Sequence, residues 1–203
     1  TDTLLQTQQL VQKKKLDKNT SEAVYFISDN TARRLTHDYF ERVYPPAIGN
    51  HHVFLIANDA SYTWSMSWSA SPKRKDVYAY YPENDRRDLL IEAQRDVFSL
   101  SPKGEWITYY NMEDSTWYSK NITTKEVNNL SSSAGTTFYT EEFDYPSTPE
   151  SYGFGGWAAV TKGKQKIEYA LIYDRYDVWM VDPSGKEAPR NLTNGRASEH
   201  TFR

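Results

Sequence analysis

The sequence contains no cysteine among its 203 residues, which excludes disulfide bonds and thiolate catalysis and leaves the redox compartment open. It also lacks any apolar run of the ~18 residues from which a membrane-spanning helix is built. Basic residues are not in excess, because 24 Lys and Arg stand against 27 Asp and Glu and give a net charge of −3. Nucleic-acid-binding chains normally carry a basic patch. We therefore expect neither a membrane span nor a nucleic-acid partner.

Catalytic and cofactor-binding motifs are absent as well. The chain has no Gly-x-Ser-x-Gly nucleophile elbow, no phosphate-binding loop, no dinucleotide fingerprint and no His-Glu-x-x-His. The adjacent His51 and His52 fall in a predicted strand, where neighbouring side chains point to opposite faces and do not share one metal ion. The sequence thus predicts no catalytic residue, no metal site and no cofactor in this chain.

Aromatic residues, in contrast, make up 15% of the sequence, with 16 Tyr and 6 Trp. Aromatic and β-branched side chains suit the half-buried surface of a pleated sheet. One unit recurs: a short strand that begins with an aromatic residue, a polar turn, and a strand that ends at leucine. Related hairpins at similar spacings indicate a repeat architecture. The four copies are residues 23–36, 76–92, 115–131 and 177–193.

A second pair of strands is predicted before each of the last three hairpins, at 51–75, 96–114 and 153–174. Two such pairs make a four-stranded antiparallel unit of the size of a β-propeller blade. We predict an all-β partial β-propeller of about four four-stranded antiparallel blades over 23–203, after an N-terminal polar segment at 1–22. The blades are placed near 23–36, 51–92, 95–131 and 153–193, and Trp106, Trp117, Trp157 and Trp179 are expected to be buried between them.

The stretch from Asp174 to Asp177, "DRYD", is either a catalytic cluster or a turn between two strands. In the fourth predicted blade one strand ends at Tyr173 and the next begins at Val178. Aspartate is common in turns, since its side chain bonds to the nearby backbone. The position between two strands therefore favours the turn.

Residues 131–153 break the rhythm of the blades and are named the strap here. Loops longer than ~12–15 residues are uncommon and tend to be functional or disordered. This one is too aromatic for plain disorder, and it carries Glu141, Glu142 and Asp144. An ordered strap packed on the sheets and a binding loop both remain open as interpretations.

The strap and the Asp174–Asp177 turn should lie on one rim, because strands of an up-and-down blade alternate in direction. Arg175 then comes within reach of the strap carboxylates, and its planar guanidinium suits a paired contact with a carboxylate.

Two long motifs carry a family resemblance: "EEFDYPSTPESYGFGGW" (141–157) and "LIYDRYDVWMVDPSGKEAPRNLTNG" (171–195). They resemble the propeller of large bacterial S9-type serine peptidases, the prolyl oligopeptidase family, of the kind common in Bacteroidetes. "SPKGEWITYY" (101–110) is similar to a strand of that family and of TolB-like propellers. The resemblance covers most of residues 23–203 and implies a TolB- or dipeptidyl-peptidase-like propeller.

In that family the propeller accompanies an α/β-hydrolase domain with a Ser/Asp/His triad, none of which is found here. Residues 198–203, "SEHTFR", look like a strand of a next blade cut short, so we expect a fragment of a larger enzyme that is itself not catalytic. Dipeptidyl-peptidase relatives hold the free amine of the substrate with a propeller Glu pair, which Glu141-Glu142 resembles. The resemblance therefore implies substrate binding at the rim, by Glu141, Glu142, Asp144, Arg175 and Tyr176.

Together these expectations describe a domain that gates or recognises peptide substrate for an α/β-hydrolase domain. The alternative is a stand-alone module that binds glycan or protein through exposed Trp and Tyr. Unpaired blade edges predict self-association. We expect a periplasmic or extracellular location, with a cytoplasmic one left open.

Overall fold

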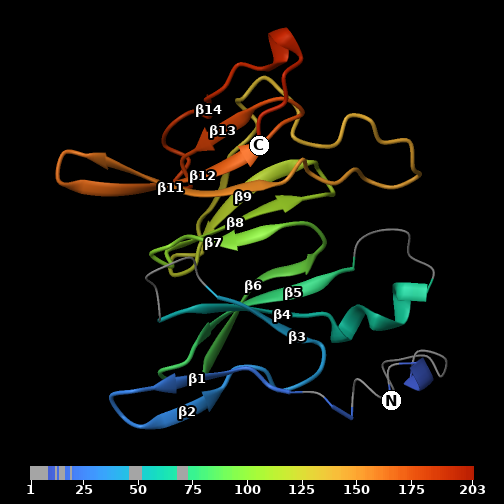
Figure 1. Cartoon of the computed structure of the whole chain (residues 1–203), viewed down its shortest axis with the longest axis vertical. Helices are drawn as coiled ribbons and strands as arrows, with labels where there is room; N and C mark the ends of the chain where they lie inside the picture. The colour runs from blue at the N-terminus through green and yellow to red at the C-terminus, as the bar shows by residue number, and fades with distance from the viewer. Residues whose placement is uncertain (1–8, 12, 14–16, 19, 46–51, 68–72) are drawn as a thin grey trace. The chain divides into compact units, whose positions relative to one another are not determined.

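Antiparallel sheets account for almost all of the regular structure, as a computed structural model shows (Figure 1). It describes residues 9–11, 13, 17–18, 20–45, 52–67 and 73–203, so most of the predicted polar segment 1–22 lies outside the described residues. Two compact units are present, one ending at Gln94 and one running from Arg95 to Arg203. The all-β prediction is confirmed, and the propeller arrangement stays a prediction. None of the described helices is long and apolar enough to cross a membrane.

The first unit holds a two-stranded hairpin and a four-stranded sheet. The hairpin is the first copy of the repeat, which remains two-stranded in the described residues. The sheet has the order β3-β4-β5-β6, so each strand pairs with its neighbour in the chain. The strands of the unit are β1 (Ala23–Phe26), β2 (Thr31–Arg34), β3 (Glu41–Tyr44), β4 (Phe54–Asn58), β5 (Lys75–Tyr81) and β6 (Arg86–Gln94).

The sequence predicted two strands over 51–75, and the prediction is wrong for the second of them. In the described residues before β5, the range contains β4 and then a 3-10 helix, η1 (Ala60–Ser67), in place of a second strand. The chain leaves the extended conformation because the Asn58 side chain accepts a hydrogen bond from the Ala60 amide at 2.9 Å, which starts the helix. The fourth strand of the sheet comes instead from β3. The predicted strand also began too early, since His52 precedes β4 and His51 lies outside the described residues.

The second unit contains two four-stranded meanders, which confirms the sheets predicted over 96–130 and 153–193. In both, spatial order follows chain order, and the Asp174–Asp177 stretch is the turn between the second and third strands of the second sheet. The first sheet is β7 (Phe98–Leu100), β8 (Trp106–Asn111), β9 (Thr116–Asn121) and β10 (Val127–Asn129). The second is β11 (Phe154–Lys162), β12 (Gln165–Tyr173), β13 (Val178–Val181) and β14 (Arg190–Asn191).

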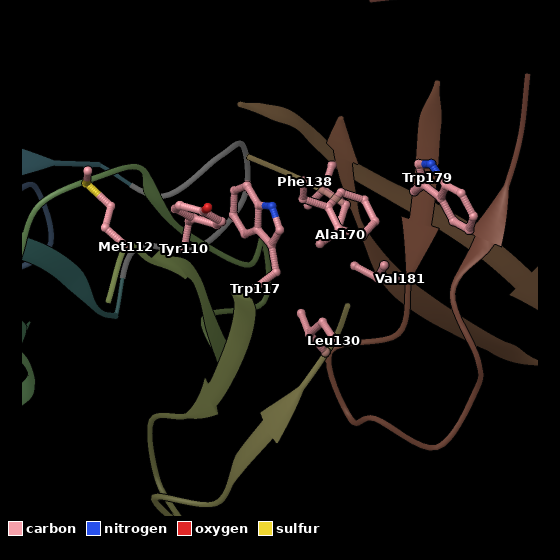
Figure 2. Packing of buried hydrophobic residues seen from close by; sticks show 9 residues of the cluster. Tyr110, Met112, Trp117, Leu130, Phe138, Ala170, Trp179 and Val181 are labelled. Carbon is pink, nitrogen blue, oxygen red and sulfur yellow. The ribbon is translucent and has the colours of Figure 1, made fainter. Parts of the chain in front are cut away.

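Aromatic side chains from both sheets and from the strap fill the core of this unit (Figure 2). Trp117 of β9 and Trp179 of β13 are buried, as predicted, and the strap contributes Phe138, whose ring meets that of Trp179 edge-on at 5.8 Å. Trp106 and Trp157 are less buried than Trp117 and Trp179, and Trp157 packs against the same cluster. The strap is therefore an ordered part of the fold.

Replacing Trp117 by alanine should destabilise the protein by about 3–5 kcal/mol, because the fully buried indole leaves a cavity that its neighbours fill only in part. Val127→Ala, at a position 49% exposed on β10, is the control and should change the free energy of unfolding by less than about 0.5 kcal/mol. Urea unfolding of the two variants checks this. Equal effects would show that the packing around Trp117 does not hold the two sheets together.

Candidate functional site at the strap rim

The strap closes on itself near its two ends. Tyr139 and Ser151 form an isolated antiparallel bridge. Beside it, the Thr140 amide donates to the carbonyl of Glu150 at 2.8 Å, and the Tyr152 amide donates to the carbonyl of Phe138 at 3.0 Å. These bonds hold residues 140–150 as a projecting loop above the core in which Phe138 is buried. The carboxylates at 141–144 are thereby presented at a fixed place.

The β12–β13 turn is built on the carboxylate of Asp174, which is fully buried. Its Oδ1 accepts hydrogen bonds from the amides of Tyr176, at 2.8 Å, and Asp177, at 2.6 Å. This is the local side-chain-to-backbone bonding for which aspartate is favoured in turns. Its Oδ2 faces the strap and accepts a bond from the Thr136 hydroxyl at 3.1 Å. The turn and the strap thus share one buried anion.

The Asp177 carboxylate fixes the segment that follows β14 through hydrogen bonds of a similar kind. It accepts hydrogen bonds from the Thr193 hydroxyl at 2.6 Å and from the Gly195 amide. Burial by itself would raise the pKa of Asp177, but these hydrogen bonds stabilise the ionised form and lower the pKa overall. The carboxylate therefore stays charged and holds the segment against the turn.

The strand expected over 198–203 is wrong. A short 3-10 helix, η2 (Arg196–Ser198), forms instead, and Glu199 ends it in the left-handed conformation with φ of 55°. The chain then turns back so closely that a Cβ on Gly195 would lie 2.2 Å from the carbonyl of His200. Finally the Phe202 amide donates to the carbonyl of Tyr176 at 2.7 Å. The last residues therefore lie on the β12–β13 turn.

Two arginines connect the three segments. Arg175 of the turn pairs with Glu142 and lies 3.5 Å from Glu141, which confirms its predicted reach to the strap. Arg196 of η2 approaches Glu141 at 3.0 Å and Asp174 at 3.4 Å. The four residues Glu141, Glu142, Arg175 and Tyr176, predicted from the sequence, do come together here.

The pKa of Glu141 reflects this network. Partial burial would raise it, but hydrogen bonds from Arg196 and the Thr137 hydroxyl, together with the arginine charges, lower it overall. The guanidinium groups of Arg175 and Arg196 lie 5.3 and 5.2 Å from the centroid of the Tyr176 ring. At such distances both arginines can make a cation–π interaction with the tyrosine ring.

The sequence prediction for Asp144 differs from the rest. Its side chain is exposed, and within the described part of the chain it forms no ion pair. The sequence did not indicate Thr136 or Arg196, whereas Asp177 belongs to the Asp174–Asp177 stretch that the sequence singled out as a turn. The Asn194-Gly195 pair before Arg196 is typical of a turn, but it does not indicate which residues Arg196 contacts.

A cavity of about 630 Å³ opens beside this network. All three bonds from Arg196 to Thr136, Glu141 and Asp174 use Nη2, and the side chain remains 43% exposed. The arrangement therefore offers hydrogen-bonding and ionic groups to a ligand. In the described part of the chain, no three His, Asp or Glu side chains are grouped to hold a metal ion. The lining includes Thr136, Thr137, Asp174, Trp179, Asn194 and Arg196.

Protein-family models give no match to this chain, and the curated proteins give none either.

The ion pairs of Glu141 should make stability depend on pH. Its pKa in the folded protein lies below the ordinary value of 4.5, so its contribution is complete above that pH and is lost as the pH falls through the lowered pKa. Glu141→Gln should therefore lower the free energy of unfolding at about pH 7, and the difference from the wild type should shrink toward about pH 3. Urea unfolding at both pH values measures it.

Glu142→Gln is the control for that experiment, because the Glu142 side chain is 72% exposed and its single ion pair is screened by solvent. It should change stability little at either pH. A Glu141→Gln effect of equal size at both pH values would contradict the assignment of its stabilising role to charge.

Proposed function

We propose that this chain is a non-catalytic part of a β-propeller that recognises peptide at the strap rim, in front of an α/β-hydrolase domain of the S9 serine peptidase type. The observation that supports it is the convergence of the strap, the β12–β13 turn and the segment 194–203 on one charged cavity. A surface loop held by a rigid scaffold is where binding residues are usually found.

Peptides suit the chemistry of this rim. Their backbone offers alternating donors and acceptors, and their ends carry opposite charges. The rim presents a partly buried cationic group on Arg175, an exposed one on Arg196 and an exposed anionic group on Glu142. The cavity volume falls within the ~300–1,000 Å³ that is usual for ligand pockets. A short peptide segment is a ligand of suitable size.

The adjacent glutamates Glu141 and Glu142 have different parts in this proposal. Glu141 is held by Arg175, Arg196 and Thr137, so its charge is compensated within the protein. Glu142 has one arginine partner and faces solvent, as does Asp144. We therefore assign the contact with a peptide ammonium group to Glu142, and a positioning part to Glu141. A glycan platform at this rim has less support, because Trp179, which lines the cavity, is buried.

Glu142→Gln should weaken binding of peptides with a free amino terminus about threefold to fivefold, as expected for loss of an exposed ion pair worth less than ~1 kcal/mol. Binding of the same peptides after N-acetylation should be weaker in the wild type and unchanged by the substitution. Isothermal titration with both peptide forms measures this.

Glu187→Gln supplies the matched control, because Glu187 is also an exposed glutamate with a single cationic partner, Lys162, away from the rim. It should leave peptide binding unchanged. Equal loss in the two variants, or equal affinity for free and acetylated peptides, would contradict the ammonium contact.

The peptidase part of the proposal has a separate test. The purified 203-residue chain should not hydrolyse peptides or esters, whereas its complete open reading frame should encode Gly-x-Ser-x-Gly with partners for a triad. Sequencing of the reading frame and an assay of the purified chain check both. A reading frame without the nucleophile elbow would leave peptide binding as the function and remove the peptidase.

A further inference from the structure

A second cavity, of about 380 Å³, lies in the same unit at the other end of the sheets. It is bounded by the β7–β8 turn, by the first residues of β12 after the β11–β12 turn and by the β13–β14 connection. In a meander, successive turns alternate between the two ends of the sheet. The strap and the β12–β13 turn therefore belong to the opposite end, and Figure 1 shows the β11–β12 hairpin and the strap on different sides of the unit.

The walls of this cavity are fixed by bonds between the two sheets. The Lys103 amide donates to the Glu168 carboxylate at 3.3 Å, and Lys103 Nζ donates to the carbonyl of Lys166 at 2.7 Å. Across the β13–β14 connection, Ser119 and Asn128 both donate to the carbonyl of Pro183. A cavity held in this way keeps its shape when a ligand binds and loses little entropy.

The same connection is shaped by Asp182, a mostly buried carboxylate. It accepts hydrogen bonds from the Ser184 amide at 2.9 Å, the Ser184 hydroxyl at 2.7 Å and the Lys186 amide at 3.2 Å. Its oxygens are thus occupied by the protein. Asp182 orders the wall and leaves ligand contacts to other residues.

Other side chains that line the cavity have unused hydrogen-bonding groups. Within the described part of the chain, the side chains of Glu105, Gln165 and Lys166 take part in no hydrogen bond or ion pair. They offer a carboxylate, an amide and an ammonium group, so the lining contains both hydrogen-bond donors and acceptors. Trp106, half-buried on β8, adds an aromatic ring to the same lining.

The mixture of charges selects the class of ligand. Lys103 and Lys166 would repel a cation, while Glu105 and Glu168 would repel an anion, so a ligand of one strong sign meets like charge on either side. Hydroxyl groups both donate and accept and match such a lining without carrying charge. A sugar ring also has a C–H face that packs on an aromatic ring.

We propose that this cavity binds a neutral saccharide of one or two rings. The Trp106 ring contacts the C–H face of the sugar, and Glu105 and Gln165 hydrogen-bond its hydroxyls. The site is separate from the strap rim and does not depend on peptide binding there. Its volume, near the lower end of the ~300–1,000 Å³ usual for ligand pockets, limits the ligand to a short one.

Saturation-transfer NMR of the 203-residue chain with glucose, N-acetylglucosamine and cellobiose tests the proposal, with glucosamine and glucuronate as charged counterparts. At least one neutral sugar should bind with a dissociation constant near 1 mM, a value typical of a small ligand held by few contacts, and more tightly than either charged sugar. Trp106→Ala should weaken this binding about tenfold, the equivalent of ~1.4 kcal/mol. Gln165→Ala, at an exposed position, should weaken it by a smaller factor.

Trp64→Ala is the matched control, because Trp64 is a 59% exposed tryptophan in the other unit, and it should leave saccharide binding unchanged. If Trp106→Ala fails to fold, Trp106→Phe, which keeps an aromatic ring and should retain binding, and Gln165→Ala decide the question. Absence of transfer from all three neutral sugars, preference for a charged sugar, or unchanged binding in Gln165→Ala would overturn the proposal.

Discussion

The buried carboxylate of Asp174 is the interaction on which the strap rim depends. A charge without access to water costs several kcal/mol unless partners replace its hydration. Asp174 obtains those partners from three segments: two amides of its own turn, the Thr136 hydroxyl of the strap, and the Arg196 guanidinium. None of these segments reaches the others through strand pairing. The need to satisfy one anion therefore brings together residues as far apart in the chain as 136 and 196.

The aromatic core below gives that carboxylate a fixed position. Trp117 and Trp179 come from different sheets, and Phe138 of the strap contacts the same cluster. Their burial has a cost, because the indole N–H groups of both tryptophans have no hydrogen-bond partner within the described residues. An unsatisfied buried donor costs about 1–3 kcal/mol, and the large apolar area of each ring offsets it. Apolar packing thus determines where the strap crosses the unit, and hydrogen bonds and ion pairs determine its local conformation.

Local patterns were enough to predict part of this structure. Alternating residues and turn signals gave the two meanders of the second unit, and the position of Asp174 between strands gave its turn. The contact of Arg175 with Glu141 followed from strand direction alone. The role of Arg196 could not be predicted, because it depends on a long-range bond to Asp174 that no local pattern encodes. The same holds for β3, whose four residues, "ERVY", carry too little alternation to mark a strand.

The charge distribution of the rim limits what it can hold. Arg196 already shares Nη2 among Thr136, Glu141 and Asp174, so a ligand carboxylate placed there would compete with two anions of the protein. Such a ligand would also lie near the buried charge of Asp174. A ligand cation would instead pair with Glu142, whose side chain is exposed and whose ion pair with Arg175 is accessible to solvent. Since exchange of a solvent-exposed partner costs little, whereas uncovering a buried anion costs much, the rim favours the ammonium end of a peptide over its carboxylate end.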